Sequence, residues 1–189
     1  SDVETSLAQE QQRLRHIETR IAQIESEGTL SADDVVLRAE PARRLLSLRR
    51  TVVSFAEARS IIGALREQSR GVLPRNHGCT LVAVAHSPQF EADEIDVEFG
   101  WSLGDLQPKL PKSSVLALSE LPAVERMAVC VRVGLPEDAH LATAKIGRFL
   151  AAVGETLSGP SREVFLQLPS PERISEAVVE MQFPVHTAA

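Results

Sequence analysis

The sequence predicts an α+β fold built from two copies of one unit, in which a helix separates two pairs of antiparallel strands. The first observation is an internal repeat: Arg44–Val52 is echoed by Arg126–Val133, and Glu98 is echoed by Glu180. Both echoes fall 82 residues later, and a shared offset indicates a duplicated unit rather than chance similarity. Since two copies are too few for a solenoid, we expect a pseudo-twofold domain with a cleft between its halves.

Two further observations support this fold class. Each copy opens with a Pro-Ala step, Pro41-Ala42 and Pro122-Ala123, one residue out of phase with the offset. The composition, 43% apolar among 189 residues, is typical of a globular core and allows one full domain plus an appendage. We therefore expect one domain over residues 31–189, with halves at about 31–107 and 115–189.

Charge and hydropathy exclude several functions. The net charge of −6 gives no electrostatic footprint for phosphate backbones, so this chain alone is not expected to bind DNA. No stretch approaches the roughly 20 apolar residues that cross a bilayer, and the polar N-terminus lacks the apolar region of a signal peptide. These features predict a cytoplasmic protein with no membrane partner. Cys79 and Cys130 are expected to be reduced and structural.

Residues 1–30 carry a heptad pattern that is typical of a coiled coil. Apolar residues fall on alternating steps of three and four, with Glu10 as the polar exception, at Val3, Leu7, Leu14, Ile17, Ile21 and Ile24. Gly28 supplies a C-terminal stop. We expect a coiled-coil helix that forms a homodimer. The alternative is one amphipathic helix packed on its own domain.

In the first unit, the apolar patterns predict two strands, a helix and two more strands. The helix begins after Ser54, because Glu57 three residues later completes a capping-box signature, and it ends before Gly71 and Pro74. The expected strands cover residues 35–37, 45–53, 79–85 and 95–103.

The second unit repeats this order after an exposed connector that contains Pro108 and Pro111. Its helix opens at Pro136 and ends near Gly154. The expected strands cover residues 115–119, 126–133, 163–168 and 178–185. Helices between antiparallel strands, without alternation of parallel strands and helices, complete the α+β prediction.

Four short motifs occur in an order that resembles the GyrI-like effector-binding domain over residues 35–185. They are Asp96-Val97-Glu98, Leu121-Pro122-Ala123, the run from Pro160 to Phe165, and the closing run from Val179 to Val185. A GyrI-like domain behind a coiled-coil helix is the layout of MerR-family multidrug-sensing transcription regulators. The resemblance implies that this chain is the dimerising, effector-sensing part of such a regulator. DNA would then be bound only through an N-terminal domain that is missing from this chain.

The resemblance also implies the chemistry of the site. In this family, a groove between the two units binds lipophilic, often aromatic or cationic, compounds. A cationic ligand offsets the cost of desolvating a carboxylate in an apolar pocket, and each ring adds a cation–π attraction of about 0.5 to 2 kcal/mol. The repeat supplies two such acids. The candidate ligand-binding residues are Glu98, Trp101, Phe165, Glu180 and Phe90.

These candidates also have plain structural interpretations. For Glu98 and for Glu180 alike, the structural alternative is a carboxylate on a strand that faces solvent. Trp101 follows Glu98 by three residues, so it lies on the opposite strand face, as an ordinary core aromatic, unless a bulge at Gly100 returns it. Phe165 occupies the place of a family tyrosine, so we expect it to offer hydrophobic contact without a phenolic hydrogen bond.

Other side chains carry weaker signals. Phe90 is a loop residue suited to the rim of a pocket. His77 and His86 have no Cys or carboxylate at ligand spacing, so no metal is expected. The sequence also has no glycine-rich phosphate loop, and no cofactor is expected. His86 and Ser87 are adjacent, and on an extended chain they would point to opposite faces, which argues against a nucleophile and its base. We therefore expect no catalytic residues.

Three functions compete. The first, which we favour, is a binding module that senses small molecules for a transcription regulator. The second is a hydrolase, because the GyrI-like fold includes enzymes that open strained electrophilic rings; Glu98 would be the general base and Trp101 the wall that positions the ring. The third is a protein-binding inhibitor of the gyrase-inhibitor type. The heptads of residues 1–30 suit a regulator better than a stand-alone hydrolase.

Overall fold

The computed structural model describes residues 35–87, 94–133, 139–168 and 177–187, together with Val3, Glu10, Gln11 and Leu14. These last four residues are helical and exposed. The rest of residues 1–34, on which the predictions of a coiled coil and a homodimer depend, lies outside the described residues.

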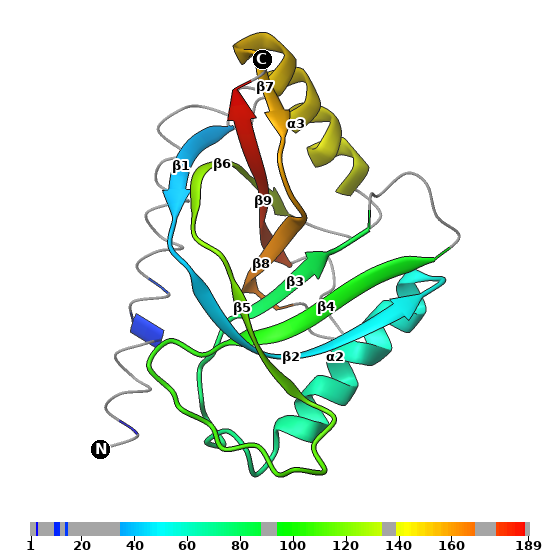
Figure 1. Cartoon of the computed structure of the whole chain (residues 1–189), viewed down its shortest axis with the longest axis vertical. Coiled ribbons are helices and arrows are strands. Elements are labelled where there is room, and N and C mark those ends of the chain that lie inside the picture. Colours follow the sequence, from blue (N-terminus) through cyan, green and yellow to red (C-terminus); the bar gives the residue numbers. More distant parts are fainter. Residues whose placement is uncertain are drawn as a thin grey trace.

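The described residues form a nine-stranded antiparallel sheet with two helices, as the α+β prediction requires (Figure 1). The first unit comprises β1 (Val36–Glu40), β2 (Arg43–Val52), α2 (Phe55–Ser69), β3 (Leu81–Ala85) and β4 (Ile95–Ser102). The second comprises β5 (Ala117–Leu121), β6 (Val124–Val133), α3 (Ala139–Val153), β7 (Glu155–Leu157), β8 (Ser161–Gln167) and β9 (Val178–Thr187). The predicted order of elements is confirmed in both units, with the short β7 as an addition that the sequence analysis missed.

The strand order shows the duplication directly. It is β1-β6-β9-β8-β3-β4-β2-β5, with β7 beside β9. Counted from the centre outwards, β3-β4-β2-β5 matches β8-β9-β6-β1, which places a pseudo-twofold axis between β3 and β8. The outermost strand of each half comes from the other unit, because β5 pairs with β2 and β1 pairs with β6. The two halves are therefore interlocked.

The Pro-Ala steps mark the two crossings between the halves. Pro41 and Ala42 lie between β1 and β2, and Pro122 and Ala123 lie between β5 and β6. Proline has no N–H to donate, so it suits a point where strand pairing stops. At each step the chain leaves one half and enters the other, which gives a physical reason for the repeated dipeptide.

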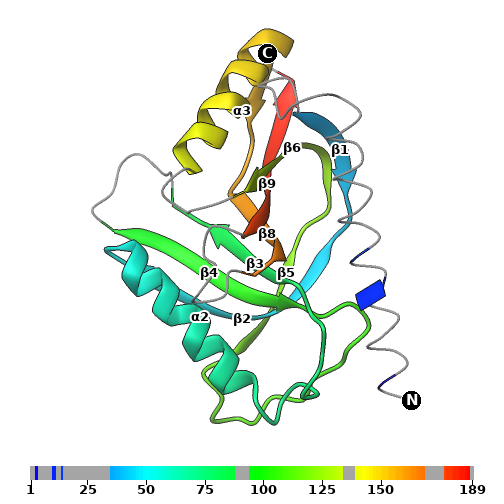
Figure 2. The same ribbon diagram turned by 180° about the vertical axis from the view of Figure 1, so that it is seen from behind.

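The helices pack against the same face of the sheet (Figure 2). Ile61 and Leu65 of α2 pack on the first half, and Ile146 and Leu150 of α3 pack on the second half. The opposite face, called here the helix-free face, carries a third apolar cluster. Its buried members are Leu45, Val82, Val84, Leu121, Val164 and Leu166. This cluster contains residues of both units and lies around the central strands.

Local signals place the start of α2 and the C-terminal ends of both helices as expected, whereas Pro136, where the second helix was expected to open, lies outside the described residues. Ser54 caps α2, where its Oγ accepts a hydrogen bond from Glu57 N at 3.2 Å, and Glu57 Oε2 accepts one from Val53 N at 2.8 Å. Gly71 and Gly154 follow the two helices with φ values of 82° and 71°, which glycine adopts without strain. No helix among the described residues is long and apolar enough to span a membrane.

Candidate functional site

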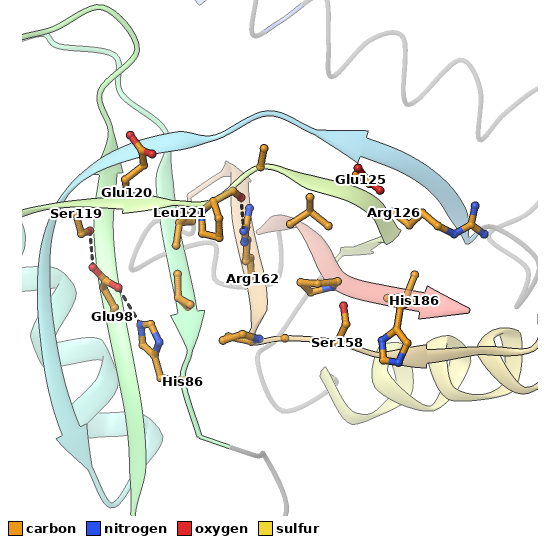
Figure 3. A pocket seen from close by; sticks show the side chains of 18 of the residues that line it. His86, Glu98, Ser119, Glu120, Leu121, Glu125, Arg126, Ser158, Arg162 and His186 are labelled. Atoms are coloured by element: carbon orange, nitrogen blue, oxygen red, sulfur yellow. Dashed lines mark hydrogen bonds and ion pairs between the residues drawn. The ribbon is translucent and has the colours of Figure 1, made fainter. Parts of the chain in front are cut away.

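An open cavity of about 820 Å³ lies on the helix-free face and is lined by residues of both halves (Figure 3). One wall is formed by β3 and β4. The opposite wall is formed by the β5–β6 crossing, the turn between β7 and β8, and the end of β9. The lining comprises residues 119–126, 158–160 and 184–187 together with Arg49, Val84, His86, Glu98 and Arg162.

Glu98 is the buried acid of this cavity. It lies in the middle of β4 and is 6% exposed. Its Oε2 accepts a hydrogen bond from Ser47 Oγ at 2.6 Å. The same oxygen accepts one from Ser119 Oγ at 2.7 Å, and Oε1 lies 2.9 Å from His86 Nε2 (Figure 3). Side chains from three different segments of the chain therefore converge on one carboxylate.

The register of the sheet brings these partners together. Ser47 on β2 and Ser119 on β5 point to the same face of the sheet as Glu98, because the strands pair in unbroken antiparallel register there. His86 follows β3, and its backbone N–H donates to Asp96 O at 2.8 Å, which holds it beside β4. The polar cluster around Glu98 is thus fixed by backbone pairing and by the interlocked β5.

Burial and hydrogen bonding act on Glu98 in opposite directions. Burial raises its pKa because it penalises the charged form, whereas hydrogen bonds from Ser47, Ser119 and His86, and the charge on a protonated His86, lower it. The lowering effects prevail, so the pKa of Glu98 lies below its ordinary value of 4.5. At neutral pH the cavity therefore contains a buried anion.

Glu180, the repeat-related acid, lies on the same face but is neutralised. It is 2% exposed. Arg38 from β1 contacts both carboxylate oxygens, with Nη1 3.5 Å from Oε2, and the Gln182 amide donates to Oε1 at 2.9 Å. Burial lowers the pKa of Arg38. The charge of Glu180 and the hydrogen bonds to Glu40 and Glu180 outweigh this effect, so the pKa of Arg38 is raised overall. Glu180 is a member of a structural ion pair and does not line the cavity.

The two acids differ at equivalent positions of the repeat. Ser119 on β5 and Arg38 on β1 occupy the same place in the register of the interlocked strands. Gly100 and Gln182 are related by the offset of 82 residues. In the second half, the Arg38 guanidinium and the Gln182 amide fill the space beside Glu180. At the equivalent positions of the first half, Ser119 has only a hydroxyl and Gly100 has no side chain. Glu98 is consequently the acid that faces open space.

Trp101 does not join Glu98. The β2–β4 and β3–β4 ladders continue through Gly100 without a break, so no bulge returns the indole to the face of Glu98, and of the two alternatives the structure has the core aromatic on the opposite face. Trp101 is 4% exposed in the core beneath α2, where Nε1 donates to Ser69 Oγ at 3.0 Å. Gly100 instead allows a close approach between strands, since a Cβ there would lie 2.9 Å from Ser47 Cβ.

Phe165 also lies on the helix-covered face, where it packs against both main cores. Glu163 precedes it by two residues on that face; burial raises the pKa of Glu163, and Arg132, whose Nη2 lies 3.8 Å away, lowers it in part. Phe90 lies outside the described residues. Of the five predicted ligand-binding residues, Glu98 alone lines the cavity in the part of the chain that the structure describes.

Four polar residues of this site were not among the predicted ligand-binding residues: Ser47, His86, Ser119 and Arg162. Ser47, His86 and Ser119 each interrupt or end an apolar strand run, and a polar residue in such a run is a usable signal because it requires a partner when buried. The signal does not say which partner. That information comes from strand pairing between residues that are far apart in sequence.

A comparison with protein families matches residues 33–186 to the GyrI-like small molecule binding domain. A search of the curated proteins finds no match. Among solved structures, the chain is similar to EcmrR in a complex with DNA, at 16% identity and a TM-score of 0.69, over 99% of this chain and 69% of that chain.

Two further solved structures share this architecture. The EcmrR C-terminal domain is similar at 17% identity and a TM-score of 0.66, over 82% of this chain and 98% of that chain. A hydrolase from Listeria innocua is similar at 12% identity and a TM-score of 0.56, over 81% and 92% of the two chains. Identities this low establish a common fold and leave the function to be argued from the site.

Proposed function

The chain belongs to the GyrI-like small-molecule-binding domains, and on this basis we propose that it is the effector-sensing part of a MerR-type transcription regulator. In this proposal the chain binds lipophilic organic cations in the cavity around Glu98. Residues 1–30 form the dimerisation helix of a homodimer, and a domain outside this chain binds DNA. The similarity in fold to EcmrR, which was solved in a complex with DNA, supports the assignment to a regulator.

The observation that carries this proposal is the contrast between the two repeat-related acids. Glu180 has Arg38 as a fixed counter-charge, whereas Glu98 is held by two hydroxyls and an imidazole and lines open space. A buried carboxylate without a fixed cation favours a ligand that supplies one. A charged hydrogen bond of this kind is worth about 1.5–3 kcal/mol, which corresponds to roughly 10- to 100-fold in affinity.

The rest of the cavity offers apolar surface to the body of the ligand. The aliphatic and proline side chains of the lining are Val84, Leu121, Pro122, Val124, Pro160, Pro184 and Val185. Trp101 and Phe165 lie on the other face, so stacking on those two rings does not contribute to binding in this cavity. We therefore propose selection by charge and by aliphatic contact.

Ligand binding at Glu98 would act on both halves at once. Ser119 donates to Glu98 and lies on β5, which continues through Pro122 and Ala123 into β6 of the other half. A ligand that replaces the Ser119 hydrogen bond changes the forces on this crossing. The resulting shift between the halves, passed to the N-terminal helix, is the proposed signal, and its size is limited by the differential affinity of the ligand for the two conformations.

A hydrolase is the second candidate, and the position of Trp101 argues against the form of it that the sequence suggested. Glu98 and Trp101 point to opposite faces of β4, so they do not form one site. The lowered pKa of Glu98 also makes it a weak general base at neutral pH. We therefore favour binding without turnover.

Titration with rhodamine B ethyl ester, a fluorescent lipophilic cation, tests this function. We expect saturable binding by fluorescence anisotropy, with recovery of the unchanged ester. Glu98→Gln should weaken binding about tenfold or more, because it removes the charge and keeps the shape. Glu120→Gln is the matched control, since Glu120 is an exposed acid that lines the same cavity.

Two results would overturn the proposal. If Glu163→Gln abolished binding and Glu98→Gln left the affinity unchanged, the ligand would bind on the helix-covered face and not in this cavity. Conversion of the ester to the free acid by the wild type, abolished in Glu98→Gln, would show an enzyme. Thermal melts of each variant establish that it is folded before binding is compared.

A further inference from the structure

Arg162 is a second charged group that lines this cavity, two strands away from Glu98 on the same face of the sheet (Figure 3). We propose that the ligand is bipolar: besides the cation that binds Glu98, it carries an anionic group, such as a carboxylate, that binds Arg162. This inference rests on the proposed function, because it assigns a second group to a ligand of the same cavity. It narrows the ligand class from lipophilic cations to lipophilic zwitterions.

The position of Arg162 is built into the fold. It lies on β8, points to the helix-free face and is 5% exposed. Its Nη2 donates to Pro122 O at 3.0 Å, the carbonyl at the crossing between β5 and β6. This bond uses one of the five N–H donors of a guanidinium and holds the side chain at the wall of the cavity. The remaining donors are suited to a carboxylate, which a guanidinium can bind through two parallel hydrogen bonds.

Arg162 differs from the other arginines of the cavity in its partners. Arg49 is ion-paired with Asp96, with Nη2 2.7 Å from Oδ2, and Arg126 is ion-paired with Glu155. Among the residues that the structure describes, Arg162 is hydrogen-bonded to a backbone carbonyl and to no carboxylate. A buried cation of this kind favours an anionic partner for the same reason that Glu98 favours a cation.

The electrostatic surroundings of Arg162 agree with this assignment. Burial lowers its pKa, and so does the neighbouring charge of Arg43, while Glu40 raises it in part. Glu40 is itself ion-paired with Arg38, so its charge is shared. An anion bound at Arg162 would relieve the unfavourable burial and the repulsion from Arg43 together.

The sheet register sets the distance between the two charges. Glu98 on β4 lies opposite Val84 on β3, and Val84 lies opposite Arg162 on β8. The two charged residues are therefore separated by two strand spacings, or about 10 Å between backbones. Val84, which lies between them, presents an apolar surface. This arrangement fits a molecule with an apolar middle and opposite charges at its two ends.

A pair of dyes that differ at one group tests this proposal. Rhodamine B is a zwitterion with a free carboxylate, and its ethyl ester is a cation with the same ring system. We expect the wild type to bind rhodamine B about tenfold more tightly than the ester, because a charged hydrogen bond is gained. Arg162→Gln should abolish this preference and leave affinity for the ester within about twofold. Arg50→Gln is the matched control and should retain the preference, since Arg50 is exposed and does not line the cavity.

The outcomes separate this inference from the proposed function. If the wild type binds both dyes equally, or prefers the ester, the second site is refuted while the cation site stands. If neither dye binds, the proposed function fails and this inference fails with it. The comparison of the two dyes on the wild type needs no variant, so the test holds even where Arg162→Gln does not fold. Where it folds, an unchanged preference in Arg162→Gln would assign the carboxylate to another cation.

Discussion

Replacement of Arg38 by Met tests the contrast between the two acids, on which the site assignment depends. In the native structure Arg38 contacts both oxygens of Glu180 and also pairs with Glu40. The variant Arg38→Met keeps much of the apolar stem of the side chain and removes the counter-charge. Glu180 keeps the Gln182 amide but becomes a buried anion without its guanidinium.

The expected loss of stability follows from the burial of the pair. Removing one partner of a fully buried ion pair costs about 3–5 kcal/mol. The Arg38 side chain is 31% exposed and that of Glu180 is 3% exposed, so solvent screens part of the interaction on the arginine side. We therefore expect a loss of about 2–3 kcal/mol in the free energy of unfolding. For a chain of this size, that corresponds to a decrease of about 5–10 °C in Tm.

Urea denaturation followed by circular dichroism and by Trp101 fluorescence measures this loss, and coincident curves test two-state unfolding. The double variant Arg38→Met with Glu180→Gln should recover part of the stability, because it removes one of the two carboxylate charges that Arg38 pairs with. Arg49→Gln, which removes an exposed ion pair with Asp96, serves as the control and should move the midpoint little. The view that Arg38 neutralises the buried charge of Glu180 would be refuted by either of two results. One is a decrease in the free energy of unfolding below about 1 kcal/mol in Arg38→Met, and the other is no recovery of that free energy in the double variant.

Two further predictions concern the pH dependence of binding and the close approach at Gly100. Since the folded pKa of Glu98 is depressed, its ionised form and its stabilising contribution persist above the ordinary value of 4.5 and are lost only as the pH falls through the lower folded value. The Kd for rhodamine B ethyl ester should therefore stay constant from neutral pH down to about pH 5, whereas a weakening that begins well above pH 5 would contradict the assignment of the binding charge to Glu98 alone. Gly100→Ala should destabilise the protein by about 1–3 kcal/mol and weaken dye binding, because the new Cβ would lie 2.9 Å from Ser47 Cβ. Gly63→Ala, in α2 with no atom within 4 Å of the new Cβ, should instead be neutral or stabilising by about 0.5–1 kcal/mol in the same urea titrations.

Much of the fold was predictable because its signals are local. The capping box at Ser54 and Glu57 marked the start of α2, and glycine marked the ends of both helices. The offset between Glu98 and Glu180 identified the duplication, since both residues occupy equivalent places on β4 and β9. The exchange of β1 and β5 between the halves was not predicted, because pairing partners in a sheet are set by contacts between distant segments rather than by local pattern.

The same limit explains what was missed at the site. Glycine in a strand indicates either a bulge or a close approach of another backbone, and sequence alone does not separate them. At Gly100 the neighbour that decides is Ser47, 53 residues earlier in the chain. Glu98 was found because it repeats, but its partners Ser119 and His86 do not repeat. Features that both copies retain can be found by comparing the copies, and features that one copy lost or gained require the structure.

The two copies of the duplicated unit therefore hold their equivalent acids in different environments. In the second half, the acid Glu180 is enclosed by Arg38 and Gln182 and stabilises the sheet. In the first half, the equivalent acid Glu98 faces a cavity whose far wall belongs to the other half. Because Arg38 and Ser119 both lie on the interlocked strands β1 and β5, each acid is held by a residue from the opposite unit. Because β5 leads directly into β6, a ligand that binds Glu98 would act on a segment shared by both halves, as the proposed effector role requires.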